Sequence, residues 1–491
     1  MTTTETRPEG DRPPGDRAFF GQPMGLANLF GVEMWERFSF YGMQGILLIY
    51  LYYSADQGGL GISQATATSI VGAYGGLVYL ATILGGWVAD RVLGSERTLF
   101  YSAVLIMIGH IALSVLPGLT GVGVGLVCVA IGSGGLKANA TSIVGDLYDE
   151  TDKRRDAGFS LFYMGINIGA LVGPLLTGLA QEKLGFHYGF GLAAIGMALG
   201  LIQYTIFRKN LGGIGKRPTD PLPAALRLRY GAAALVVLIA LAVLIAAGVI
   251  HASNLANITV GVSIFAAICY FVVILASRQV DRIERRRVIA FIPLFIASVA
   301  FWSLFQQIFT VLTIYADKRM NRDIFGWTFP VSWVQSIEPV WVIALAPVFA
   351  AMWDKLGDRQ PSTPIKFALG TAGMGVAFLL FLPLTGSGPN SVPVIAVIAI
   401  LAVFAVSELL LSPVGLSLAT KLAPKAFHTQ MVALFFLSVA LGTALSGSLA
   451  GYYDENNEFP YFLWLGVVAV AIGVVLTLIA RPIRTLMGGV R

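Results

Sequence analysis

Long apolar runs alternate with short polar segments along almost the whole chain. A helix needs about 20 apolar residues to cross the roughly 30 Å hydrocarbon core of a bilayer. Runs of this length recur when the sequence is divided at charged, Pro-containing and Gly-rich positions. The pattern predicts fourteen membrane-spanning helices, at residues 27–54, 64–90, 98–116, 120–145, 157–181, 187–208, 226–249, 254–277, 288–316, 327–353, 363–384, 392–421, 427–450 and 460–481.

The composition excludes most other classes of protein. Of the 491 residues, 56% are hydrophobic and 12% are charged, whereas a typical soluble domain has about 25% charged residues. A disordered chain, a coiled coil and a disulfide-rich secreted fold are therefore excluded. Cys128 and Cys269 both lie in apolar runs, so we expect neither a disulfide framework nor a metal cluster. The expected class is an all-α integral membrane protein.

The basic residues indicate how the chain is oriented. With both termini placed in the cytoplasm, 27 of the 33 Lys and Arg residues fall in cytoplasmic segments and two lie inside the membrane. The predicted outside loops hold only Lys183, Lys318, Arg319 and Arg322. This asymmetry follows the positive-inside rule, so the net charge of +6 does not require a nucleic-acid partner. We expect a multi-pass protein of the cell (inner) membrane.

Two basic stretches divide the chain into parts. A cytoplasmic tail at 1–26 lacks the basic-then-apolar order of a signal peptide and precedes six spans at 27–208. Residues 209–287 hold cytoplasmic linkers and two extra spans, which we expect to face lipid beside the core. Six more spans occupy 288–481, and 482–491 form a second cytoplasmic tail.

This order of helices resembles the major facilitator superfamily. In that fold, two six-helix bundles surround a central cavity, which gives twelve core helices and two extra helices here. The loop after the second span, GGWVADR at 85–91, is similar to the inter-helix motif of the superfamily. An ordinary charged turn is the alternative interpretation of that loop.

Six charged residues lie inside predicted spans, where each costs at least about 2.5–3.5 kcal/mol. Both bases fall in the first half of the chain, and the second half contains acids only. Glu33, Glu36 and Arg37 are spaced i, i+3 and i+4, so they share one helix face, which we expect to line the cavity. They are interpreted as a proton-titratable ion-pair cluster; a purely structural cluster is the alternative. The other three charged residues are Lys137, Glu338 and Glu408.

Two polar residues of the fourth and fifth spans add to this set. Lys137 follows Gly134 and Gly135, and these glycines allow helices to pack closely. The alternative for Lys137 is a lysine that reaches back to the membrane surface. Asn167 offers both a donor and an acceptor to the cavity, and a hydrogen bond between helices is its alternative role.

The acids of the second half lie beside prolines. Glu338 immediately precedes Pro339, and Glu408 precedes Pro413; proline tends to kink a helix and to free carbonyl groups. Four acids and two bases leave an excess of negative charge, which a proton or a substrate ammonium would relieve. A ligand with a carboxylate at one end and an ammonium at the other, such as a short peptide, fits this segregation. Glu338 could instead lie near a membrane boundary.

Four motifs resemble one family, the proton-dependent oligopeptide transporters (POT family). EMWERFSFYGM at 33–43 is similar to the family's ExxERFxYYG motif, and GGLKAN at 134–139 to its fourth-helix motif. FYMGIN at 162–167 and ELLLSPVGLS at 408–417 resemble two further motifs of the family. The resemblance extends over nearly the whole chain, and two extra central helices also occur in bacterial members.

The resemblance implies roles for the residues that match. Arg37 and Lys137 would receive the peptide carboxylate, and Glu408 with Asn167 would hold the ammonium. Glu33 and Glu36 would couple proton movement to Arg37, and other cavity residues would be Tyr41, Tyr79, Trp302, Gln306 and Phe435. The implied function is proton-driven import of di- and tripeptides by alternating access. No cofactor besides the proton and no partner besides the peptide is implied, and the chain would work as a monomer.

The chain also departs from the family pattern. Gln44 replaces a usual Arg, and Gln306 replaces a Glu that many members use in proton coupling. Phe40 and Phe435 stand where Tyr and Trp are usual. Glu338 stands where the family has Asn. Our hypothesis is that Glu338 takes over proton handling or ammonium binding; the alternative is that it only tunes specificity.

Other functions remain as alternatives. The same fold could carry another zwitterionic or peptide-like substrate, or could work as a uniporter with weak or absent proton coupling. An enzyme is not expected, because the four histidines are scattered and neither HExxH nor GxSxG occurs. A channel or a receptor is not expected either, because the chain has no filter repeats and no large ligand-binding domain.

Overall fold

The computed structural model describes residues 17–149, 152 and 154–489. Most of the tail expected at 1–26 lies outside this part of the chain. Thirteen helices among the described residues are long and apolar enough to cross a membrane. The helix α1 (Met24–Tyr52, 29 residues) is a further long helix. It is too polar to be counted among these thirteen because it carries the three charged residues of the first motif. Together these helices occupy the fourteen segments that the sequence predicts.

The first half of the chain forms one helical bundle. Its helices pack against one another, with α1 against α5 and α6, and α4 against α2 and α3. A π-helical turn, Ala89–Leu93, extends α2. The members of the bundle are α1 (Met24–Tyr52), α2 (Gln64–Val88), α3 (Ser95–Val115), α4 (Gly118–Asp146), α5 (Arg155–Leu184) and α6 (Phe186–Phe207).

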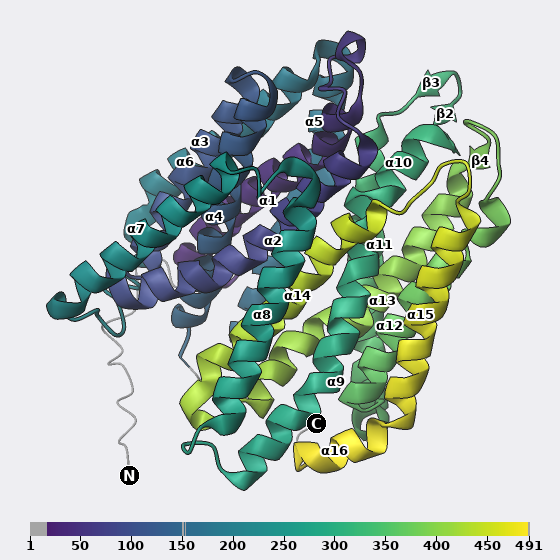
Figure 1. The fold of residues 1–491 in the computed structure, drawn as a ribbon. Helices are drawn as coiled ribbons and strands as arrows, with labels where there is room; N and C mark the ends of the chain where they lie inside the picture. The colour runs from purple at the N-terminus through teal and green to yellow at the C-terminus, as the bar shows by residue number, and fades with distance from the viewer. Residues whose placement is uncertain (1–16, 150–151, 153, 490–491) are drawn as a thin grey trace.

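The second half forms another bundle, which Figure 1 shows in green and yellow beside the purple and blue first bundle. Its helices are α9 (Arg282–Phe305), α10 (Val311–Lys318), α11 (Val334–Leu356), α12 (Thr363–Leu379), α13 (Val394–Leu422), α14 (His428–Ala450) and α15 (Phe459–Leu478). The described part of the last segment contains a short helix, α16 (Ala480–Met487), that packs against α9 and α12. Two small strand pairs lie in the loops: β1 (Met320–Asn321) with β4 (Val392–Pro393), and β2 (Asp323–Ile324) with β3 (Trp327–Thr328).

Two spans differ from their predicted form. The segment expected as one helix at 288–316 is interrupted by a 3-10 turn, Gln306–Phe309, between α9 and α10. Gln307 accounts for the break, since its side-chain amide donates to the backbone carbonyls of Ser303 and Ser446 at 3.3 and 3.2 Å. The segment expected to begin at residue 327 begins instead at Val334, because 327–333 form a strand and a 3-10 turn.

The two bundles meet along α2 with α14 and along α5 with α11. At the first of these contacts, a Cβ atom on Gly72 would lie only 2.5 Å from Cα of Gly447. Glycine is therefore required for the two backbones to approach this closely.

The two extra helices are α7 (Ala224–Ala246) and α8 (Leu255–Ala276). None of the residues of α7 is buried, and this helix lies at the edge of the molecule in Figure 1. In contrast, α8 packs against α2 and α14. Thus α7 fits the expectation of a lipid-facing helix, whereas α8 also covers the seam between the bundles.

Candidate functional site

A cavity of about 1540 Å³ lies between the two bundles. This volume exceeds the roughly 300–1,000 Å³ of a usual small-molecule pocket, because the cavity continues to one face of the protein. The residues around its mouth come from the ends of α2 and α4, the linker before α7 and the start of α14: Asp90, Arg91, Asp149, Asp220 and His428. This is the face to which the distribution of basic residues assigns the cytoplasm.

The opposite end of the cavity is closed by contacts between the bundles. The hydroxyl groups of Tyr52 and Tyr53 both donate to the carboxylate of Asp317, each at 2.6 Å. The ammonium of Lys318 and the guanidinium of Arg322 lie 3.6 and 3.8 Å from the same carboxylate. These side chains form a gate that joins the end of α1 to the end of α10.

The 3-10 turn Val331–Trp333 and the start of α11 close the same side by donating to carbonyl groups of α5. Ser336 donates to Leu171, and Ser332 donates to Pro174, both at 2.9 Å. The indole of Trp333 also donates to a carbonyl of α5, at 3.0 Å. Pro174, which has no N–H, lies within the continuous helix α5 where these contacts form. The structure is therefore open on one face and closed on the other.

The charged cluster of the first motif is buried on α1. The Nε atom of Arg37 lies 2.5 Å from Oε2 of Glu36 and 3.2 Å from Oε1 of Glu33. Ser133 of α4 donates to the other oxygen of Glu36 at 2.7 Å. The Nη2 atom of Arg37 is buried and has no hydrogen-bond partner, so it is a donor that a ligand can use.

One expectation for this cluster is wrong. Glu33 and Arg37 line the cavity, but Glu36 does not. Glu36 is completely buried, because it turns toward Ser133 on α4 rather than toward the open space. The i, i+3, i+4 spacing correctly places the three residues together, yet a single helix face is wide enough to contact both a cavity and a neighbouring helix.

The second base, Lys137, lines the cavity on α4. Its ammonium lies 4.5 Å from the ring centre of Tyr79, in a cation–π contact. Among the described residues, no carboxylate forms an ion pair with Lys137. Lys137 and the Nη2 atom of Arg37 thus offer hydrogen-bond donors to the cavity.

The two acids of the second bundle contact each other across two helices. Glu338 of α11 and Glu408 of α13 both line the cavity and interact electrostatically with one another. The Oε1 atom of Glu338 is buried and has no hydrogen-bond partner. Pro339 and Pro413 both lie inside their helices, as expected. The two cavity acids that have no basic partner among the described residues therefore belong to the second bundle, and both cavity bases belong to the first.

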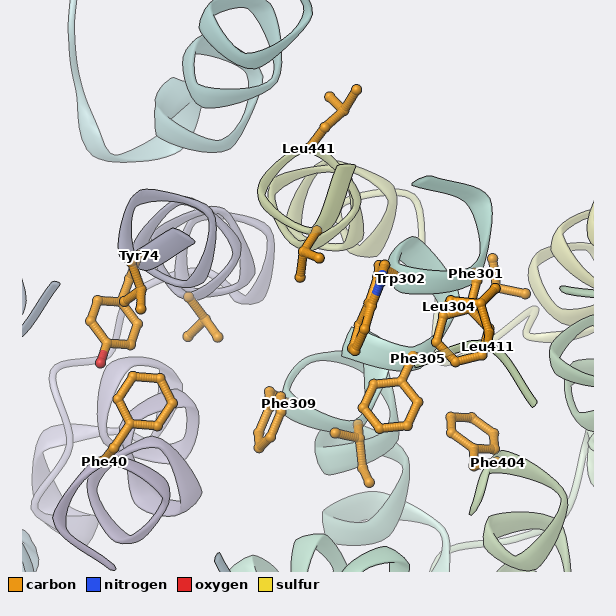
Figure 2. Close-up of a cluster of buried hydrophobic side chains, with 14 of the residues drawn as sticks. Phe40, Tyr74, Phe301, Trp302, Leu304, Phe305, Phe309, Phe404, Leu411 and Leu441 are labelled. Carbon is orange, nitrogen blue, oxygen red and sulfur yellow. The ribbon is translucent and has the colours of Figure 1, made fainter. Parts of the chain in front are cut away.

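Neutral and aromatic side chains fill the space between these charges. Tyr41 stacks on Phe309, with ring centres 6.1 Å apart. Figure 2 shows Phe40 on one side of the gap, with Trp302 and Phe309 on the other. The further predicted residues that line the cavity are Asn167, Gln306 and Phe435. Every predicted site residue except Glu36 thus lies on the cavity wall.

Tyr163 is a cavity residue that the sequence interpretation passed over. It interacts electrostatically with Glu408 and Glu338, and its backbone carbonyl accepts a 2.9 Å hydrogen bond from Asn167. A signal was present, since Tyr163 precedes Asn167 by one helical turn in the same motif and therefore shares its face.

Comparison with known proteins identifies the family. The sequence profile of the POT family matches residues 96–465. A di-/tripeptide transporter of Lactococcus lactis subsp. cremoris is 41% identical, over 97% of this chain and 99% of its own. An uncharacterized transporter of Bacillus subtilis is 42% identical, over 96% and 97% of the two chains. The chain belongs to the POT family.

Solved structures of POT proteins match the fold closely. The crystal structure of peptide transporter POT in complex with sulfate superposes with a TM-score of 0.92, at 46% identity, over 96% of this chain and 97% of that one. A POT family transporter in complex with 5-aminolevulinic acid gives a TM-score of 0.90 at 40% identity, over 95% and 98%. This chain is therefore an integral membrane transporter of the POT family and not an enzyme.

Proposed function

We propose that this POT protein is a proton-coupled symporter that imports di- and tripeptides by alternating access. It works as a monomer in the cell membrane, with both termini in the cytoplasm and with the proton as its only coupling ion. One observation carries the proposal: Arg37 and Lys137 line the cavity from the first bundle, whereas Glu338 and Glu408 line it from the second. A short peptide has its own charges separated in the same way.

The carboxylate of the peptide binds Arg37 and Lys137. The buried Nη2 atom of Arg37 has no hydrogen-bond partner, and a charge-assisted hydrogen bond there would contribute about 1.5–3 kcal/mol. The ammonium of Lys137 contacts the ring of Tyr79 rather than a carboxylate, so it is available to bind the peptide carboxylate. The side chains of Tyr41 and Tyr79 border the same part of the cavity.

The ammonium of the peptide binds Glu408, with the amide of Asn167 nearby as a further polar group. Trp302, Gln306 and Phe435 form walls for the peptide side chains. A wall of aromatic rings and one amide contacts side chains of many kinds without strict selection, because stacking and apolar contact need no specific donor or acceptor.

Proton coupling follows from competition for Arg37. Arg37 is the cation that both Glu33 and Glu36 contact. A peptide carboxylate that draws Arg37 away leaves the two acids in a poorly solvated site, where protonation is favoured. Peptide binding and proton uptake thereby support each other.

Glu338 is the second coupling candidate, since Gln306 has no proton to exchange. It lies at the start of α11, two residues after Ser336, which bonds to α5 on the closed side. A change of charge at Glu338 is therefore transmitted over a short distance to the closed gate. Uptake that remains proton-driven in a Glu338→Gln variant would rule out this role.

The driving force is sufficient for accumulation. One charge crossing 100 mV yields about 2.3 kcal/mol, and one pH unit adds about 1.4 kcal/mol. One proton per peptide therefore supports accumulation on the order of a hundredfold or more. The named functions of relatives agree with a peptide substrate: two Lactococcus lactis relatives are di-/tripeptide transporters.

A second candidate keeps the fold and changes the substrate or the coupling. Related structures contain alafosfalin and 5-aminolevulinic acid, which favours other zwitterionic or peptide-like substrates. Gln44 and Gln306 are both buried in the cavity wall and neutral. These neutral residues favour weak coupling or uniport.

Accumulation of a labelled dipeptide in proteoliposomes separates these candidates. We expect Ala-Ala to accumulate when the outside is acidic or the inside is electrically negative, and unlabelled tripeptides to compete. Free alanine and 5-aminolevulinic acid should compete poorly. Accumulation of Ala-Ala that ignores both pH and voltage would instead indicate uniport.

A further inference from the structure

The contact between Glu338 and Glu408 leaves an unused acceptor in the cavity wall. Glu338 and Glu408 come from two different helices, line the same cavity and interact electrostatically. The Oε1 atom of Glu338 is buried and has no partner. A buried polar group without a partner costs about 1–3 kcal/mol, so a ligand that supplies a donor here is favoured.

Among the residues that the structure describes, none supplies a cation to the pair. The ionisable groups that interact with Glu408 are the hydroxyls of Tyr41, Tyr79 and Tyr163, from α1, α2 and α5. Gln306, from the turn after α9, is neutral. No Lys or Arg of the described chain forms an ion pair with either acid.

The bases of the opposite wall make their own contacts, away from the acidic pair. Arg37 is paired with Glu33 and Glu36, and Lys137 lies against the ring of Tyr79. The acidic pair can therefore be neutralised only by protons or by the substrate.

We infer that the Glu338–Glu408 pair selects peptides whose first residue has a basic side chain. The inference rests on the proposed peptide transport and adds a substrate class to it. The α-ammonium of the peptide binds Glu408, and the side-chain ammonium binds the free oxygen of Glu338. Each carboxylate of the pair then faces one cation.

The sequence position of the basic residue matters in this arrangement. In Lys-Ala, both ammonium groups belong to the first residue and reach the same wall. In Ala-Lys, the side-chain ammonium is attached to the residue whose carboxylate binds Arg37 and Lys137, so it lies toward two like charges. Only the first of these two peptides gains from Glu338.

Counterflow in proteoliposomes tests the inference without a proton gradient. Labelled Ala-Ala exchanges against internal Ala-Ala, while Lys-Ala, Ala-Lys or Met-Ala competes from outside. Met-Ala has a first side chain of similar length without a charge. We expect Lys-Ala to compete about tenfold better than Met-Ala and Ala-Lys, since one charge-assisted hydrogen bond contributes on that order.

Variants assign the preference to Glu338. In Glu338→Gln and in Glu338→Asn, the ratio between Lys-Ala and Met-Ala should fall to about one. Asp149→Asn removes a carboxylate from the cavity mouth, where Asp149 is exposed, and should keep the tenfold ratio. This control distinguishes a specific effect of the Glu338–Glu408 pair from a general attraction of cations to acidic side chains in the cavity.

The outcomes are distinct. Equal competition by Lys-Ala and Met-Ala in the unmodified protein would overturn the inference and leave peptide transport intact. A ratio that persists in both Glu338 variants would also overturn it. Absence of any Ala-Ala counterflow would remove the proposed function itself, and the inference with it.

Discussion

Tyr53 at the end of α1 donates a 2.6 Å hydrogen bond to Asp317 of α10, and this contact joins the two halves of the protein on the closed side of the cavity. The neighbouring Tyr52 donates to the other oxygen of the same carboxylate, also at 2.6 Å. Hydrogen bonds to a charged acceptor are roughly twice as strong as neutral ones. Two such bonds must break before α1 and α10 can separate.

Removal of the two hydroxyls should shift the protein toward its other state. In a Tyr52→Phe, Tyr53→Phe variant, each lost bond to Asp317 removes about 1.5–3 kcal/mol from the state that is closed on this side. Spin labels at residues 56 and 390, both exposed in loops on this side, should report longer distances in the variant. Distances equal to those of the unmodified protein would show that the α5–α11 contacts alone hold the gate.

The contact between α2 and α14 should tolerate no added carbon atom. A Cβ on Gly72 would lie 2.5 Å from Gly447, so Gly72→Ala should force the helices apart, at a cost of about 1–3 kcal/mol, and slow uptake. Gly123→Ala on α4 is the matched control, because nothing lies within 4 Å of a Cβ there. If both variants melt and transport alike, close packing of the bundles is not required.

Arg319 should contribute strongly to the stability of the second bundle. Its Nε atom lies 2.9 Å from Oε1 of Glu458, which is only 2% exposed, and Tyr453 donates to the same oxygen at 2.7 Å. Arg319→Ala would leave a buried carboxylate without its cation, at a cost of about 3–5 kcal/mol. Thermal melting in detergent should show a clear decrease in Tm.

The exposed neighbour of Arg319 provides the comparison. Lys318 has a side chain that is 41% exposed, and an exposed ion pair contributes about 0–1 kcal/mol. Lys318→Ala should therefore leave the Tm almost unchanged. Equal decreases in Tm for Arg319→Ala and Lys318→Ala would mean that the contact with Glu458 stabilises the protein no more than an exposed ion pair does.

The Glu36→Gln and Glu408→Gln variants should differ in which transport activity they lose. Glu36 does not line the cavity, so Glu36→Gln should retain peptide exchange and lose proton-driven accumulation. Glu408→Gln removes the ammonium site and should reduce both peptide exchange and proton-driven accumulation by at least about tenfold. Counterflow and accumulation assays on the same proteoliposomes would distinguish them; accumulation that survives in Glu36→Gln would exclude Glu36 from coupling.

The sequence predicted the helices well because membrane insertion depends on hydropathy summed over about 20 residues. It missed the turn between α9 and α10 because that turn depends on a contact between distant segments. The side chain of Gln307 reaches the carbonyl of Ser446 on α14, and no local pattern encodes this pairing.

The composition of the site was predictable, but its contacts were not. Each charged residue inside a span was recognisable from its cost in the membrane, and most of these residues lie on the cavity wall. The cavity brings together Glu338 and Glu408, which are 70 residues apart on two helices. Glu36 instead contacts Ser133 on α4. These contacts depend on how the helices pack against one another, and the periodicity of the sequence does not describe that packing.

Simultaneous recording of peptide and proton movement tests the proposed function most directly. Proteoliposomes with an internal pH dye, equal pH on both sides and voltage clamped at zero receive external Ala-Ala. We expect internal acidification that follows peptide uptake and is absent in Glu408→Gln. Peptide uptake without acidification would contradict proton-coupled symport.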